Sequence, residues 1–264
     1  MNKYNTKYPI VLVHGMVLKD FKLFRAFRKI KDNLLKENIK VYVTNQDGVG
    51  SIENNAKQLK DEILEILEIL KKENVDKVNI IAHSKGGLDS RYMISKLNMD
   101  KHVASLTTLS TPHHGSKLST KLLSMPKWCA KFIAFWVNLF YKINKDKNPD
   151  ILKLGYQLKD DTMKEFNKEV LNSPNVYYQS YSSDLSNKKS FLMFIPHLIT
   201  KHLENVSTDG IVSVESSAWG DYKGNMKNNY DHAQMVGVYG SNKTMKEVSN
   251  FYLDIIKNLS EIGF

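Results

Sequence analysis

A serine stands where an apolar run gives way to a helical pattern, in the stretch NIIAHSKGGLDSRY at residues 79–92. Small residues lie two positions before and two positions after this serine, at Ala82 and Gly86. A tight strand-to-helix turn, called a nucleophile elbow, brings those two positions together and exposes the hydroxyl at the end of a sheet. Ser84 is therefore a candidate nucleophile for acyl transfer, although short Ser/Gly patterns also occur by chance in ordinary turns.

A serine nucleophile needs a base that takes its proton, and the histidines late in the chain are the candidates. Where an elbow carries the serine, the groups follow the chain order serine, acid, histidine, which leaves His197, His202 and His232. His232 lies in the polar segment NNYDHAQMVGV, and such loops commonly carry catalytic groups. His197 lies inside the apolar segment FLMFIPHLI, where a packed core histidine is the better interpretation. We therefore favour His232.

The acid that would orient the histidine is best placed at Asp209, in the segment STDGIVSVESSAWG. An Asp-Gly pair makes a tight turn, and this turn precedes an apolar, strand-like run, which suits the presentation of a carboxylate. An aspartate that only forms the turn is the alternative, and Asp184 and Asp231 are rival acids. Asp231 adjoins His232 directly, and adjacent side chains rarely meet in the required geometry.

Two backbone N–H groups would have to stabilise the oxyanion that acyl transfer creates. The first apolar run ends at His14-Gly15-Met16, and a loop in this position supplies one donor, while the residue after the nucleophile supplies the other. The sequence therefore predicts an oxyanion hole formed by the amides of Met16 and Lys85. We interpret the ring of His14 as structural.

Alternating strand and helix patterns along the chain would position these groups. Apolar spacing predicts strands at 10–13, 39–43, 78–82, 103–109 and 176–181, and helices at 21–37, 59–70, 88–97 and about 243–259. This alternation implies right-handed crossovers and a mainly parallel sheet. No internal repeat is present, so we expect one α/β domain over residues 1–264.

The alternation lapses over residues 117–175, which we interpret as an insertion that caps the site. Within it, residues 128–143 (WCAKFIAFWVNLFYKI) are apolar nearly all round, yet too short for a membrane span of about 20 residues. One interpretation is an ordinary buried helix. The interpretation we favour is a lid that opens at a lipid surface and contacts substrate through four aromatic residues, Trp128, Phe132, Phe135 and Trp136.

The composition disfavours several other classes of protein. The single cysteine, Cys129, rules out an intrachain disulfide, and the sequence has no P-loop, dinucleotide fingerprint or Cys-x-x-Cys motif. The formal net charge of +10 comes almost entirely from lysines spread along the chain, without the arginine-rich stripe of nucleic-acid readers. We therefore expect no nucleic-acid partner, and a solvated surface with a weak attraction to anionic lipids.

Other polar residues have structural interpretations. Asp89 and Arg91, on the helix after Ser84, are predicted to form an ion pair, because an interior arginine is normally paired. His113 and His114 have no carboxylate or cysteine at metal-ligand spacing, so no metal is predicted there. The first residues contain no apolar leader, which favours a cytoplasmic location; a secreted protein whose leader has been removed is the alternative.

Five blocks, in this order, resemble the bacterial triacylglycerol lipases of the α/β-hydrolase superfamily: YPIVLVHGM, AHSKGGLDSRY, LTTLSTPHHGS, TDGIVSVESSAWG and DHAQMVGV. They cover both ends of the chain, and the insertion is the weakly matched part. The resemblance implies an α/β-hydrolase fold and a lipase that cleaves lipid acyl esters. It also implies Ser84, Asp209 and His232 as nucleophile, acid and base, with Met16 and Lys85 as oxyanion donors.

The sequence departs from that family at positions that bear on cofactors. Ala82 stands where the elbow often has glycine. Gln234 stands where many secreted members have an aspartate that binds a structural calcium, so we expect no metal and no cofactor. An esterase, thioesterase or acyltransferase for short soluble acyl groups is the first alternative function. A non-catalytic lipid-binding protein on the same scaffold is the second. The sequence predicts no oligomeric state.

Overall fold

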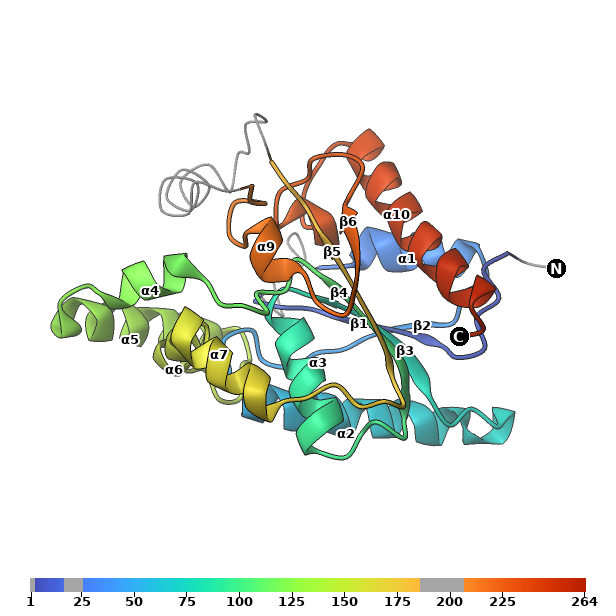
Figure 1. The fold of residues 1–264 in the computed structure, drawn as a ribbon, viewed down its shortest axis with the longest axis horizontal. Helices are drawn as coiled ribbons and strands as arrows, with labels where there is room; N and C mark the ends of the chain where they lie inside the picture. Colours follow the sequence, from blue (N-terminus) through green and yellow to red (C-terminus); the bar gives the residue numbers. More distant parts are fainter. Residues whose placement is uncertain (1–2, 17–25, 186–206) are drawn as a thin grey trace.

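The computed structural model describes residues 3–16, 26–185 and 207–264, which form a parallel sheet with helices on both faces (Figure 1). The six strands lie in the order β2-β1-β3-β4-β5-β6, and neighbouring strands run parallel. Their bounds are β1 Ile10–Val13, β2 Val41–Val43, β3 Val78–His83, β4 Val103–Leu109, β5 Tyr177–Ser182 and β6 Asp221–Asn225.

The strand order reverses between β1 and β3, which lie side by side although β2 follows β1 in sequence. In open parallel sheets, ligands bind at such a switch point, in the crevice outside the carboxyl ends of the strands. The carboxyl end of β1 leads into Gly15, and the carboxyl end of β3 leads into Ser84. The topology therefore brings the two predicted oxyanion segments to one crevice.

Helices cover both faces of the sheet, which explains why β3 and β4 are buried along their whole length. On one face lie α1 (Arg28–Lys36) and α10 (Asn242–Glu261), and on the other lie α2 (Ile52–Leu70) and α3 (Lys85–Lys96) (Figure 1). Each face has its own apolar core. Tyr252 of α10 and Ile63 of α2 are fully buried members of the two cores.

Four helices in the insertion project beyond the end of the sheet (Figure 1). They are α4 (Lys117–Leu123), α5 (Lys127–Ile143), α6 (Ile151–Gln157) and α7 (Asp160–Glu169). Three short helices, η2 (Lys71–Glu73), α9 (Val214–Ser217) and η3 (Gln234–Val236), lie in the connections elsewhere. The insertion is thus helical and is positioned over the edge of the sheet where the predicted site lies.

Two buried aspartates join the segment after α5 to the loop after β2. Asp47 accepts hydrogen bonds from the backbone N–H groups of Lys147 and Asn148, both at 2.8 Å. In the other direction, Asp146 accepts from the backbone N–H of Val49 at 3.0 Å. Hydrogen bonds that a carboxylate accepts are stronger than neutral ones. This reciprocal exchange fixes the C-terminal end of α5 to the body of the protein.

The structure confirms the predicted strands, and the helices predicted at 88–97 and about 243–259, to within a few residues, whereas the helix predicted at 59–70 already begins at Ile52. The helix predicted at 21–37 is described only from residue 26, and His197 and His202 lie outside the described residues. The prediction of a strand-like run after Asp209 is wrong, because that segment forms a turn followed by α9. The polar edge strand β6 was not predicted, since its mostly exposed residues DYKGN carry no apolar alternation.

No helix among the described residues combines the length and the apolar character that crossing a membrane requires.

Candidate active site

Ser84 occupies a strained turn between β3 and α3. Its φ of 55° and ψ of −135° lie in a region that residues other than glycine rarely adopt. Its N–H donates to the Leu109 carbonyl at 2.9 Å, and its own carbonyl accepts from Thr111 Oγ1 at 2.7 Å. Gly86 is required here, because a Cβ at that position would lie 2.5 Å from the carbonyl oxygen of His14. The predicted elbow is present.

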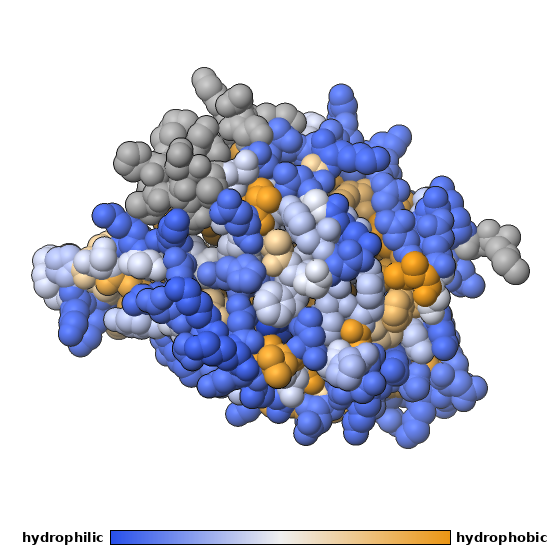
Figure 2. Space-filling model, in the orientation of Figure 1, coloured by the Kyte–Doolittle hydropathy of each residue, from blue (hydrophilic) through white to orange (hydrophobic). Residues whose placement is uncertain are grey.

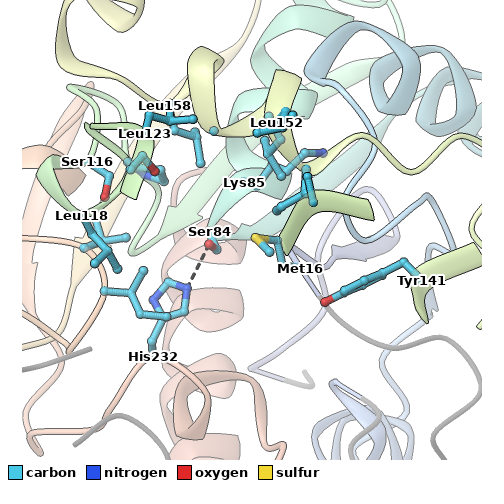
Figure 3. A pocket seen from close by; sticks show the side chains of 18 of the residues that line it. Met16, Ser84, Lys85, Ser116, Leu118, Leu123, Tyr141, Leu152, Leu158 and His232 are labelled. Carbon is cyan, nitrogen blue, oxygen red and sulfur yellow. Dashed lines mark hydrogen bonds between the residues drawn. The ribbon is translucent and has the colours of Figure 1, made fainter. Parts of the chain in front are cut away.

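His232 links Ser84 to Asp209, although the three residues are far apart in the chain. His232 Nε2 lies 2.9 Å from Ser84 Oγ (Figure 3), and His232 Nδ1 lies 2.7 Å from Asp209 Oδ2. Asp209 is fully buried and His232 nearly so. In this arrangement, an N–H at Nδ1 donates to the carboxylate, which leaves Nε2 free to accept the proton of the serine hydroxyl.

Asp209 is held for this contact by its own turn. Its Oδ1 accepts hydrogen bonds from the backbone N–H groups of Ile211 and Val212, at 3.0 and 2.9 Å, so Oδ2 faces His232. The N–H of His232 also donates to the Asp209 carbonyl at 3.0 Å. The rival Asp231 instead accepts from the backbone N–H groups of Ala233 and Gln234, at the start of η3. The structure thus brings Asp209, among the predicted acids, to the imidazole.

The two predicted oxyanion segments lie against the nucleophile. A Cβ at Gly15 would lie 2.7 Å from Ser84 Cβ and 3.2 Å from Ser84 Oγ, so the loop after β1 touches Ser84. Met16 and Lys85 line the same cavity as Ser84, and neither backbone N–H donates to another described residue. The Lys85 amide is also at the N-terminus of α3, where the helix dipole favours negative charge.

His83, directly before the nucleophile, packs against the imidazole of His232. The centroids of the two rings are 4.4 Å apart, and burial lowers the pKa of His83 well below its usual value. The ring therefore stays neutral and does not repel a protonated His232. Sequence reasoning missed this contact. The alternation along β3 was the available signal, since it puts His83 on the same sheet face as Ile81, the face that α10 covers.

A buried ion pair joins Lys85 to Asp89 within α3. Lys85 Nζ lies 2.9 and 2.8 Å from the two carboxylate oxygens, and Asn55 donates to the same carboxylate at 3.2 Å. Burial raises the pKa of Asp89 to about 6, against the lowering effect of Lys85. The predicted pairing of Asp89 with Arg91 is wrong. Residues four apart share a helix face, whereas residues two apart do not.

Arg91 points instead toward the C-terminal end of α7 and toward the segment after β4. Its guanidinium donates to Asn167 Oδ1 at 2.9 Å and to the Val170 carbonyl at 3.0 Å, and lies 3.2 Å from His113 Nδ1. The guanidinium carbon lies 3.6 Å from the ring centroid of Trp219, which is a cation–π contact. Burial lowers the pKa of Arg91 to about 9. Arg91 thus joins α3 to the base of the insertion.

A cavity of about 460 Å³ adjoins Ser84 and His232 (Figure 3). Its size falls in the usual range for small-molecule sites. Most of its wall is apolar and comes from the insertion, the residues after Asp209 and the segment after His232. The aliphatic residues that line it include Leu118, Leu123, Leu152, Leu154, Leu158, Ile211, Val212, Val236 and Val238. This wall is suited to a hydrocarbon chain.

The face of α5 that borders the cavity differs from the face predicted to contact substrate. Ala130, Ile133, Ala134 and Tyr141 line the cavity. The four predicted aromatic contacts do not line it, and they are 54–74% exposed: Trp128, Phe132, Phe135 and Trp136. Nor is α5 an ordinary buried helix, because Ala134 is its only buried residue. The helical period turns residues 130, 134 and 141 inward and the aromatic residues outward.

The side chain at the family's calcium position is engaged within the protein. Gln234 Oε1 accepts the backbone N–H of Asp231 at 3.2 Å, as part of the turn that opens η3. In the described part of the chain, no three His, Cys, Asp or Glu side chains gather as a metal site would require. The Gln234 side chain therefore serves this turn.

The fold and the cluster around His232 define a serine hydrolase of the α/β-hydrolase class. Residues 5–184 match the family described as "Putative serine esterase (DUF676)", and the chain belongs to this family. It is a carboxylic-ester hydrolase.

Three similar proteins illustrate the relationship. Triacylglycerol lipase 2 of Saccharomyces cerevisiae is 32% identical over 255 residues, which are 89% of this chain and 73% of that protein. A triacylglycerol lipase of Pseudarthrobacter phenanthrenivorans is 32% identical over 142 residues, which are 51% of this chain and 44% of that protein. The crystal structure of the mature Bacillus licheniformis lipase BlEst2 has a TM-score of 0.69 at 20% identity, over 95% of this chain and 92% of that one.

Substituting Gly15 with alanine should lower kcat for ester hydrolysis about 100-fold, because displacements near 1 Å at a reacting centre have effects of that size. The added Cβ would meet Ser84 Cβ at 2.7 Å and would push the loop that carries the Met16 amide away from the nucleophile. Steady-state kinetics on dissolved p-nitrophenyl butyrate would measure the effect. The thermal midpoint serves as the control for folding. Unchanged kcat in the folded variant would contradict the role of this loop.

Proposed function

We propose that the chain hydrolyses acyl esters of lipids, with Ser84 as nucleophile, His232 as general base and acid, and Asp209 as the residue that orients His232. One observation carries the proposal. His232 bridges Ser84 Oγ at 2.9 Å and Asp209 Oδ2 at 2.7 Å, beside an apolar cavity of about 460 Å³. The names of the similar lipases support the same substrate class.

In the proposed reaction, Ser84 Oγ attacks the ester carbonyl carbon while His232 Nε2 takes the hydroxyl proton. The amides of Met16 and Lys85 donate to the resulting oxyanion, and a single donor of this kind contributes about 3–4 kcal/mol. His232 then gives its proton to the departing alcohol, which leaves an acyl-enzyme at Ser84. A water molecule, deprotonated by His232, then attacks the acyl carbonyl carbon. His232 returns this proton to Ser84 Oγ as the bond to the serine breaks and the carboxylic acid departs.

Residues 117–175 form the cap in this proposal, and its helix α5 is the surface that meets lipid. The outward side of α5 and its last turn carry large apolar side chains that are 39–74% exposed: Trp128, Phe132, Phe135, Trp136, Leu139, Phe140 and Ile143. Exposed apolar surface of this extent is typical of an interaction site. Figure 2 shows apolar atoms on the projecting end of the molecule, between hydrophilic residues.

The charge of the protein favours an anionic lipid surface as the partner of α5. Lys127, Lys131 and Lys142 flank the apolar side chains on this helix, and the formal net charge of the chain is +10. Basic residues near an anionic membrane surface contribute about 1 kcal/mol each. The same helix lines the cavity on its other side, so a lipid held there has a short path to Ser84.

The double variant Phe132→Ser/Trp136→Ser should lose at least about tenfold of its rate on emulsified tributyrin, since a large apolar side chain transferred into lipid contributes about 1.5–3 kcal/mol. Its rate on dissolved p-nitrophenyl butyrate should match the parent, because neither residue lines the cavity. Both rates would be measured side by side. Ile69→Ser on α2, where Ile69 is 71% exposed, is the matched control and should alter neither rate.

An acyl-chain-length series with the parent protein separates the alternatives. A steep preference for short dissolved esters, without a rise in rate above the solubility limit, would favour a soluble esterase, thioesterase or acyltransferase. It would also remove the lipid-surface role of α5. No turnover of any ester, together with no labelling of Ser84 by a fluorophosphonate, would favour a lipid-binding protein without catalysis.

A further inference from the structure

The part of the cavity wall that comes from the insertion is mainly apolar, and Tyr141 adds a hydroxyl to it. It lies near the C-terminal end of α5 and is the one tyrosine among the described residues that line the cavity. Figure 3 shows its hydroxyl end directed from α5 toward the side where Met16 and Ser84 lie. That hydroxyl makes no hydrogen bond with any described residue.

Three other polar residues that line the cavity, Ser84, His232 and Lys85, already have partners. Ser84 and His232 are hydrogen-bonded to each other, and the Lys85 ammonium is paired with Asp89. Burial raises the pKa of Tyr141 to about 12, with a further contribution from Asp146, so the phenol is protonated and can donate. A half-buried donor without a partner favours a ligand that brings an acceptor.

Tyr141 is also held in place. The N–H of Asp146 donates to the Tyr141 carbonyl at 3.0 Å, and Asp146 in turn accepts from the N–H of Val49 at 3.0 Å. Asp47 holds the following two amides, as described above. The end of α5 that carries Tyr141 is therefore fixed relative to the body of the protein, and a fixed hydrogen-bonding group discriminates better than a mobile one.

The cavity has two unlike sides around Ser84. In Figure 3, Leu118, Leu123 and Leu158 lie on one side of the nucleophile and Tyr141 lies on the other. An ester bound at Ser84 has an acyl part and an alcohol part on opposite sides of the scissile bond. The leucine side suits the hydrocarbon of the acyl part, so the alcohol part extends toward Tyr141.

We propose that Tyr141 determines specificity for the alcohol part of the substrate, by donating a hydrogen bond to a second oxygen on that alcohol. The preferred substrates are then acyl esters of polyols, in which a free hydroxyl or a second ester carbonyl accepts this bond. Simple alkyl esters lack the acceptor. The inference rests on the proposed esterase function and adds to it a residue that selects the leaving group.

The test compares two dissolved esters that differ only in the alcohol, 1-monobutyrin and propyl butyrate. Tyr141→Phe removes only the hydroxyl and should lower kcat/KM on monobutyrin about tenfold, the size expected for one neutral hydrogen bond. Its kcat/KM on propyl butyrate should stay within about twofold of the parent value, since that ester offers no acceptor at this side. Tyr156→Phe, at an exposed tyrosine of α6 that does not line the cavity, is the matched control and should change neither value.

Each outcome decides between the two proposals. Equal losses on both esters, or no loss on either, would overturn the specificity role of Tyr141 and leave the esterase function intact, because the parent still hydrolyses both. If the parent shows no Ser84-dependent hydrolysis of either ester, both proposals fail. A tenfold loss confined to monobutyrin supports the role of Tyr141.

Discussion

Replacing Ser84 with alanine should reduce ester hydrolysis by about 10⁴- to 10⁶-fold, the range found when a nucleophile of this kind is removed. The reason is that no other hydroxyl stands at hydrogen-bond distance from His232 Nε2 among the described residues. The fold should survive, because His232 is the one partner that the Ser84 side chain has among the residues that the structure describes. Release of p-nitrophenol from dissolved p-nitrophenyl butyrate measures the loss.

Ser90→Ala is the matched control for this experiment. Ser90 lies on α3, which begins directly after Ser84, and is fully buried; its hydroxyl donates to the Gly86 carbonyl at 2.7 Å rather than facing the cavity. Its removal should leave the rate within about twofold, since such a bond back to the preceding turn contributes little to a helix. Comparable rates for Ser84→Ala and the parent would refute the assignment.

The three side chains should also behave as one unit. Adding His232→Ala to Ser84→Ala should lower the residual rate little further, because the base has no function without the hydroxyl that it deprotonates. A second large loss in the double variant would mean that His232 serves another reaction, in which Ser84 takes no part.

The sequence predicted the strands from the burial of their residues and the site from the order of its residues along the chain. Strand β3 was predictable because helices cover both sides of the sheet, so most of its residues are apolar. The cluster of Ser84, Asp209 and His232 was predictable because the elbow and the required order leave few candidates. Contacts that depend on the rotation of a helix about its axis, or on where an insertion packs, were much harder to predict from the sequence.

Two residues show why the remainder was missed. Tyr141 borders the cavity only because Ala130 and Ala134 turn the same face of α5 inward, and a helix that is apolar nearly all round does not reveal which face that is. Lys85 was noticed only for its backbone amide. Its ammonium is buried against Asp89, an arrangement that spacing permits but does not require.

Substituting Asp89 with leucine should destabilise the protein by about 3–5 kcal/mol, because it leaves the buried ammonium of Lys85 without its partner. Both side chains are almost completely inaccessible to solvent, at 2% and 0% exposure. Asn55 loses one bond but still donates to the Asp47 carbonyl. Denaturant unfolding at neutral pH would measure the change. The double variant Lys85→Met/Asp89→Leu should recover most of the loss, because neither charge then remains in the interior.

The two single variants should differ in how their stability depends on pH. In the parent, burial raises the pKa of Asp89 from 3.8 to about 6, so between these values the native state holds a proton that the unfolded chain has lost. Stability therefore falls as pH rises through that window. Lys85→Met removes a group that lowers this pKa, so the fall should extend to higher pH. Asp89→Leu lacks this carboxyl, so the fall should be absent.

The double variant supplies the decisive comparison, because it carries neither charged group of the pair. Its unfolding free energy should also lack the fall with pH, and its activity should remain near that of the parent, since the proposed oxyanion donor at position 85 is the backbone amide rather than the side chain. If the losses of unfolding free energy in the two single variants simply add in the double variant, Lys85 and Asp89 do not act as a pair. Loss of activity in a stable double variant would mean instead that the buried pair holds the elbow in its strained conformation.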